Sequence, residues 1–273
     1  MLVLLSANAK MAAEMKEETK EPPAQMLGDG GSEAQRPLYG RLMGAIHIQH
    51  TWGNRLGMMK LPLLLLDLKL YGGAIAQFYV LTRTLEEEIE KHASHPLVAH
   101  VRTSVGLKPL APGYAADLAQ IFGDAWADAV VAARTPAIDE YVATLRRAGP
   151  VELVAALFIL YGALVVGGGK QTQKKVQRVL PGCDHILFDV AEEMRDARRR
   201  FKNAFTAIAK DHAGVAAVAP ESTDELVAFA RAYMHRNNTV VLSVRVLPAW
   251  FWPALAVGAV AAAAVAVARR RAH

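Results

Sequence analysis

The sequence predicts an all-α fold, and three observations support this. Of its 273 residues, 53% are hydrophobic but only 7% are aromatic, a composition that suits helices better than a β-sandwich. Hydrophobic residues recur at helical spacing through most of the chain, and Pro and Gly interrupt that pattern at intervals typical of helices of ordinary length. The chain is also long enough for one large domain with a substantial buried core.

The two ends of the chain differ from the middle. Residues 1–36 mix glutamates with prolines and a glycine-rich run, and with so little apolar surface we expect a disordered leader. Residues 246–268 are 23 positions without a charge, which at about 1.5 Å per helical residue would cross a bilayer core of roughly 30 Å. The aromatic run at 250–252 suits one membrane interface and the basic tail 269–273 the other. We expect a transmembrane tail anchor; a buried Ala-rich helix and an interfacial helix are the alternatives.

Residues 37–245 are expected to form one helical domain between these ends. Breaks are predicted where Pro and Gly cluster, and Ser222-Thr223 before two acidic residues is a helix-start signal. The predicted helices cover residues 37–60, 63–91, 114–133, 136–148, 151–180, 186–212 and 222–245.

Cysteine usage and charge exclude several classes of protein. The single cysteine, Cys183, cannot form an internal disulfide, and no Cys/His grid is present for structural zinc. The net charge of +5 owes three charges to Arg269–Arg271. No dense basic face with base-reading groups is evident, so we expect no nucleic-acid partner.

His50 is the candidate metal ligand. Leu42, Ile46 and His50 form an i, i+4, i+8 row, which predicts that the imidazole lies on the inward, apolar face of the first helix. A buried neutral imidazole is a good axial ligand for iron. The alternative is an ordinary core histidine. His47 falls on a neighbouring face and is expected to be exposed.

The glycine run before Lys170 permits two interpretations. A phosphate loop would need Gly and Ser or Thr where the chain has Leu164 and Gln171. In the middle of a helix each glycine costs about 1 kcal/mol relative to Ala. Gly167 and Gly168 therefore suggest a kinked helix that a flat ligand can approach closely, with close helix packing as the alternative.

Two charge runs remain to be explained. The four carboxylates of Glu86–Glu90 indicate a solvated face or a bridge to basic partners. Glu88 and His92 share a helix face, but a di-iron site would need a second such pair. The basic residues Arg198–Arg200 and Lys202 are solvated or meet the carboxylates of an acidic ligand.

Together these stretches resemble the heme oxygenase family. Order and spacing agree across about 45–245. The matching stretches are His50-Thr51; Tyr79 with Leu85–Glu90; Asp117–Ala119 with Phe122-Gly123 and Trp126; Thr135–Ala137 with Tyr141-Val142; Glu152-Leu153; Gly168-Gly169 with Lys174-Lys175; and Phe201-Lys202.

The resemblance implies a helical fold in which heme lies between the first helix and a glycine-kinked distal helix. It implies that His50 is the proximal iron ligand, that Gly167 and Gly168 let heme approach the backbone, and that Lys202 holds a propionate. The implied activity cleaves heme to biliverdin, carbon monoxide and ferrous iron, with electrons from a reductase. A tail anchor also fits the family, which favours the endoplasmic reticulum; the mitochondrial outer membrane is the alternative.

The distal motif departs from the family pattern. Leu164 and Val165 replace its Gly-Asp, Tyr161 stands for its distal arginine, and Thr206 stands for its second propionate-binding arginine. Valine has no acceptor with which to organise water. Two alternatives therefore stay open beside the enzyme: a non-catalytic heme carrier or sensor of the same fold, and a tail-anchored scaffold without heme.

Overall fold

The computed structural model describes residues 37–106, 108–167, 169–208, 220–247 and 257, and this part of the chain is helical, without a strand. The all-α prediction is thus confirmed there. The expected leader 1–36, the basic tail 269–273 and nearly all of the expected anchor 246–268 lie outside the described residues. Among those described, no single helix is long and apolar enough to span a membrane, although α8 and α9 pass such a test as a bent pair.

Ten α-helices and two short 3₁₀ turns are found in the described residues. The turns are η2 (Gly123–Ala125) and η3 (Ile186–Phe188). In chain order the α-helices are α2 (Leu38–Leu64), α3 (Leu68–Lys91), α4 (Pro96–Val105), α5 (Ala111–Phe122), α6 (Trp126–Ala133), α7 (Pro136–Arg147), α8 (Pro150–Val165), α9 (Gly169–Val179), α10 (Met194–Ala207) and α11 (Pro220–Ser243).

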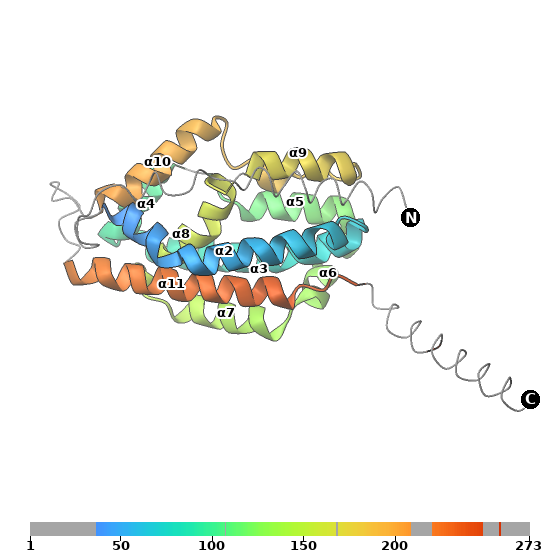
Figure 1. Cartoon of the computed structure of the whole chain (residues 1–273), viewed down its shortest axis with the longest axis horizontal. Coiled ribbons are helices and arrows are strands. Elements are labelled where there is room, and N and C mark those ends of the chain that lie inside the picture. The colour runs from blue at the N-terminus through green and yellow to red at the C-terminus, as the bar shows by residue number, and fades with distance from the viewer. Residues whose placement is uncertain (1–36, 107, 168, 209–219, 248–256, 258–273) are drawn as a thin grey trace, which may run out of the picture.

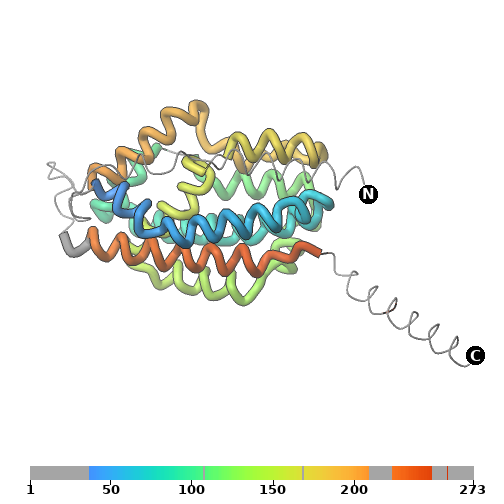
Figure 2. Tube along the Cα trace, viewed as in Figure 1, coloured from blue at the N-terminus to red at the C-terminus, as the bar shows by residue number. Residues whose placement is uncertain are grey.

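The long helices α2, α3 and α11 follow the long axis of the molecule (Figure 1). Helix α11 packs against both α2 and α8, while α3 contacts α5, α6, α7 and α8. Helix α10 crosses one end of the molecule, where it contacts α4, α2 and α8. Figure 2 shows the same arrangement as a trace, with α9 and α5 toward the opposite end from α10 and α4. Helices α2 and α8 are therefore held by the same two neighbours, α10 and α11.

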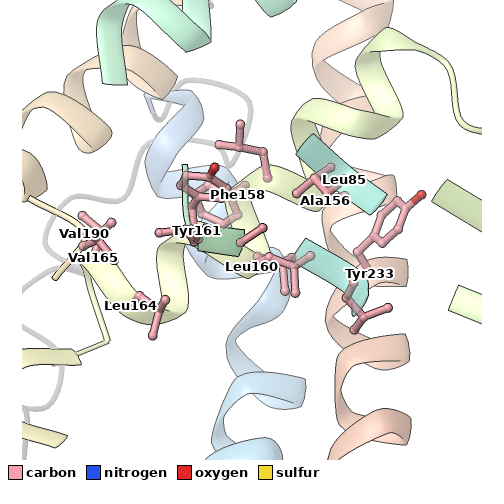
Figure 3. Close-up of a cluster of buried hydrophobic side chains, with 14 of the residues drawn as sticks. Leu85, Ala156, Phe158, Leu160, Tyr161, Leu164, Val165, Val190 and Tyr233 are labelled. Carbon is pink, nitrogen blue, oxygen red and sulfur yellow. The ribbon is translucent and has the colours of Figure 1, made fainter. Parts of the chain in front are cut away.

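Helix α8 lies at the centre of the core. All of its residues from Leu153 to Tyr161 are buried, so it has no polar face, as expected of a helix surrounded by others. Figure 3 shows Phe158 and Leu160 of this helix in one buried cluster with Leu85 of α3 and Tyr233 of α11.

The first helix is longer than predicted. It was expected to end at residue 60, yet α2 runs to Leu64 with Pro62 inside it. Proline removes one helical hydrogen bond, but the last turn is held by other contacts. Leu64 is buried, and Lys60 Nζ donates to the carbonyl oxygens of Leu242 (2.5 Å) and Val244 (2.8 Å).

Helix α4 was not predicted. The sequence there begins with Pro96, which is well tolerated in the first turn of a helix. The buried residues Leu97, Val98 and Val101 form its inward face. Gly106 ends it in a left-handed conformation (φ 54°), the usual way for a helix to stop.

Two predicted long helices are interrupted. Gly123, with φ 59°, ends α5 and separates it from α6 within the predicted helix 114–133. An α-helix was predicted to start at residue 186, but the chain forms a short turn there. The Asp117 carboxylate accepts from the backbone N–H groups of Ile186 (2.7 Å) and Leu187 (2.9 Å). These bonds tie turn η3 to α5, and α10 begins only at Met194.

The tightest helix crossing is that of α2 and α11. Asn238 is buried, and its Nδ2 donates to the Gln49 carbonyl oxygen at 2.7 Å. A Cβ atom on Gly53 would lie 2.3 Å from Asn238 Oδ1, so any larger residue there has to displace the Asn238 side chain. Arg41 pairs with Asp224 near the start of both helices. Together these contacts fix the position of α2 along the axis of α11.

Replacing Gly53 with Ala should test this crossing. The added methyl group has to displace Asn238, and overpacking of this kind costs about 1–3 kcal/mol of unfolding free energy. Gly44→Ala is the matched control, because a Cβ on Gly44 of the same helix meets nothing within 4 Å. It should stabilise α2 by about 0.5–1 kcal/mol. Urea unfolding of the two variants measures both effects, and equal midpoints would contradict the crossing.

Candidate heme site

His50 lies on α2 at the edge of its buried face. Leu42 and Ile46 of the predicted row are buried, while His50 is half-buried and His47 is exposed. The row therefore leads from the core to the border of the domain rather than ending in the core. His50 is accessible enough for a ligand to reach its imidazole.

The His50 ring is held by its own helix. Asn54, one turn along α2, places Nδ2 3.4 Å from His50 Nδ1. Which atom donates depends on the imidazole tautomer and on the amide orientation, since Asn oxygen and nitrogen are interchangeable by a flip. Asn54 thereby restrains the rotation of the ring, a role that the sequence pattern did not indicate.

An aromatic cluster joins α2, α8 and α10. The ring of Phe158 on α8 lies 6.0 Å from Tyr39 of α2, 5.8 Å from Phe201 and 4.9 Å from Phe205 of α10. Lys202 follows Phe201 directly and is exposed. Because Phe201 is buried, it fixes the position of Lys202 on the outer face of α10.

The predicted kink is present between α8 and α9. The two helices meet at an angle of 55°. A Cβ on Gly167 would lie 2.5 Å from the carbonyl oxygen of Ala163, and one on Gly169 equally close to that of Leu164. The chain itself thus requires glycine at both positions in order to turn. Gly168 lies outside the described residues.

The distal positions of α8 are closed by apolar packing. Val165 is fully buried and Leu164 nearly so, with Val190 in the same part of the buried cluster (Figure 3). The Val165 carbonyl oxygen accepts from Arg198 Nε of α10 at 2.9 Å. A cation at the end of a helix stabilises its last free carbonyls. Arg198, predicted to be solvated or to meet an acidic ligand, is exposed and also joins α10 to α8 through this hydrogen bond.

The hydroxyl of Tyr161 on α8 is engaged in a hydrogen bond within the protein. Its hydroxyl donates to Glu86 Oε1 at 2.7 Å, and the same oxygen accepts from the backbone N–H of Leu110 at 2.6 Å. The Ala111 N–H adds a longer bond. Burial raises the pKa of the Glu86 carboxyl, although these three donors act to lower it. Glu86 therefore links α3, α8 and the start of α5.

The Glu86–Glu90 run is not one solvated face. Glu87 and Glu90 are exposed, but Glu86 is half-buried and Glu88 is buried beside Lys91, whose Nζ donates to it at 2.7 Å. Leu85 and Ile89, which are also buried, flank these inward carboxylates. Their helical spacing was the available signal that part of the run faces the core. Among the described residues no group of three acidic, His or Cys side chains could hold a metal ion.

The raised pKa of Glu86 predicts a specific dependence of stability on pH. A carboxyl whose pKa is higher in the folded than in the unfolded state binds more protons when folded. Its contribution is thus present below pH 4.5 and is lost as pH rises through the folded pKa. Glu86→Gln removes this titration. The unfolding free energy of wild type minus that of Glu86→Gln should fall as pH increases above 4.5, measured by urea unfolding. A difference that stays constant or grows would contradict the raised pKa.

Comparisons with known proteins identify the family and the fold. The family model described as heme oxygenase matches residues 37–242. No curated protein matches the chain. Similar solved structures include heme oxygenase 2 from Chlamydomonas reinhardtii without heme, with 25% identity, a TM-score of 0.67, and coverage of 78% of this chain and 100% of that one.

Two bacterial structures share the fold at lower identity. Heme oxygenase-1 from the cyanobacterium Synechocystis in complex with heme has 17% identity and a TM-score of 0.63, covering 84% of this chain and 100% of that one. Heme oxygenase from Leptospira interrogans has 15% identity and a TM-score of 0.63, covering 76% and 98%. The family match extends over most of the chain, and we conclude that this protein belongs to the heme oxygenase family.

Proposed function

We propose that the protein binds heme between α2 and α8, with His50 as the axial iron ligand, and opens the heme ring to biliverdin, carbon monoxide and ferrous iron. The observation that carries the proposal is the position of His50. In a chain that matches the family over residues 37–242, its imidazole is half-buried on α2 and restrained by Asn54. Helices α10 and α11 support both α2 and α8, the two walls of the proposed site.

The residues around His50 fit an axial ligand. If His50 held the iron through Nε2, its ring proton would be on Nδ1, which would then need an acceptor. The Asn54 amide accepts this bond if its oxygen faces the ring, and such a partner orients the ligand and fixes its tautomer.

Lys202 is suited to bind a heme propionate at the edge of the proposed site. Its exposed ammonium, fixed in place through Phe201, is one charge available to a heme carboxylate. Thr206, one turn later, uses its hydroxyl to donate to the Lys202 carbonyl oxygen at 2.8 Å. Lys202 would therefore hold one propionate without help from Thr206.

The protein's part in the reaction is to bind, orient and exclude water. Heme, when bound, supplies both the redox-active iron and the ring that is opened, and a reductase would supply electrons. The apolar residues of α8 exclude bulk water from the distal side. The kink at Gly167 sets the direction in which α8 ends. Neither Leu164 nor Val165 can hold a proton, and the Tyr161 hydroxyl is bonded to Glu86.

A non-catalytic heme carrier or sensor of the same fold is the second candidate. The buried Val165 side chain favours it, because the family's distal aspartate at this position organises water and valine cannot. The groups proposed to bind heme lie on α2 and α10, so loss of the distal acceptor leaves them intact.

We also propose that residues 246–268 anchor the protein in a membrane with the domain facing the cytosol. Support comes from the sequence alone, in 23 charge-free positions followed by three arginines. The family favours the endoplasmic reticulum, and the mitochondrial outer membrane is the alternative.

Replacement of His50 tests the proposed ligand. The full-length protein in detergent, titrated with hemin, should develop the Soret band of histidine-ligated heme at one equivalent. His50→Ala should abolish this band and weaken binding at least about tenfold, and added imidazole should restore ligation. His47→Ala, on the exposed side of the same helix, is the control and should behave as wild type. Unchanged spectra for wild type and His50→Ala alike on hemin addition would favour the scaffold without heme.

Turnover of the complex separates the enzyme from the carrier. With oxygen and a reductase or chemical reductant, the Soret band of the wild-type complex should decay while biliverdin absorbance appears and carbon monoxide is released. The rate should fall with His50→Ala. A Soret band that persists under reducing, aerobic conditions would rule out the enzyme and support the carrier.

A further inference from the structure

A row of exposed apolar side chains runs along α2. Ile48 (78% exposed), Trp52 (43%), Met59 (63%) and Leu63 (38%) lie on the helix, and Leu66 (49%) follows its end. At 100° per residue the four helical positions fall on one side of α2, and Leu66 extends the row past the helix end. We name these five residues the α2 stripe. A group of large exposed apolar side chains on one side of a helix is typical of a contact with another molecule or with a membrane.

The charges around the α2 stripe are mainly positive. Helix α2 has 27 residues and not one of them is acidic. Arg55 is exposed on the same side, between Trp52 and Met59, and Lys69 and Arg245 are exposed near the end of the row. The nearby Asp67 carboxylate accepts from the backbone N–H of Lys69 and Leu70 as a helix cap. A helix with Trp, long apolar and basic residues is typical of the lipid–water interface.

The chain leaves the domain beside the end of the α2 stripe. Val244 and Val246 pack with Leu64, Leu70 and Ala74, next to Leu63 and Leu66 in the chain. The end of α11 lies toward the same end of the molecule as the end of α2 (Figure 1). The sequence that follows is the charge-free segment 246–268. A bilayer that receives this segment would lie against the stripe.

We propose that the α2 stripe is a membrane-contact surface, on which the domain rests against an anionic bilayer. The apolar side chains of the stripe enter the interfacial layer, and Arg55, Lys69 and Arg245 meet lipid phosphates. His50 is two residues from Ile48 and points about 160° away from it on the helix, so the proposed heme site stays outside the lipid. The inference does not depend on heme binding or turnover.

Lipid-specific quenching of a label on the stripe tests this contact. Met59→Cys carries an environment-sensitive fluorophore in the full-length protein, reconstituted in phosphatidylcholine and phosphatidylserine vesicles with doxyl-labelled lipid. Cys183 is buried and burial raises its thiol pKa to about 11, so labelling is selective for the new cysteine. Arg199→Cys is the control, on α10, where the side chain is 71% exposed. We expect several-fold stronger quenching at position 59 than at 199, and the same for Leu63→Cys.

Each other outcome overturns the inference. Equal quenching at positions 59 and 199, or failure of the protein to float with vesicles, would exclude a membrane contact. Shielding of the label at 59 from aqueous iodide without lipid quenching would mean that protein covers the stripe. If dilution removes that shielding, a second copy is the cover; if not, another segment of the same chain is. None of these readouts involves heme, so they remain separate from the test of His50.

Discussion

The close approach of α2 and α11 at Gly53 determines where the proposed heme ligand lies. Because Gly53 has no side chain, the Asn238 side chain fits between the two helices and reaches the Gln49 carbonyl, one residue before His50. A larger residue at 53 would push α2 outward and move the imidazole with it. An apolar residue at 238 could fill the space but could not bond to Gln49. This crossing therefore places one wall of the site, and the aromatic cluster around Phe158 ties that wall to α8 and α10.

Glu86 holds α8 in position through hydrogen bonds, as Asn238 holds α2. Its half-buried carboxylate accepts hydrogen bonds from the Tyr161 hydroxyl and from the backbone N–H groups at the start of α5. Its pKa is raised because burial outweighs these donors, so burial makes the charged form of the carboxylate less favourable than in the unfolded chain. The hydrogen bonds compensate for part of that cost. They also hold α8, which is apolar on all sides, in one rotation about its axis relative to α3.

Local pattern predicted much of the fold, and long-range contacts account for the rest. Apolar spacing identified most helices, and the glycine run identified the bend between α8 and α9. The same reasoning missed α4 and the interruption before α10, because a short helix and a turn depend on partners elsewhere in the chain, such as Asp117 on Ile186. The row through His50 predicted an imidazole on the inward face, whereas His50 is half-buried, because its exposure depends on what the neighbouring helices leave uncovered. Asn54 and Arg198 act through side-chain contacts that spacing cannot predict.

The residues proposed to ligate heme and the residues expected to support its turnover lie largely on different helices, so turnover could be lost while heme binding is kept. The proposed binding groups, His50 and Lys202, lie on α2 and α10, whereas the departures from the family pattern at Tyr161, Leu164 and Val165 lie on α8. The remaining departure, Thr206, lies on α10 and concerns the second propionate. On α8 the Val165 side chain is buried, and its carbonyl oxygen accepts a hydrogen bond from Arg198. The end of α8 is therefore stabilised without a side-chain acceptor at position 165. An aspartate at this position would enter an apolar cluster, and its burial without a partner would be unfavourable unless neighbouring residues changed with it. Restoring a typical distal network would thus require repacking of this corner, not a single substitution. If the protein opens heme, the water beside the heme must be ordered by groups other than the Val165 side chain.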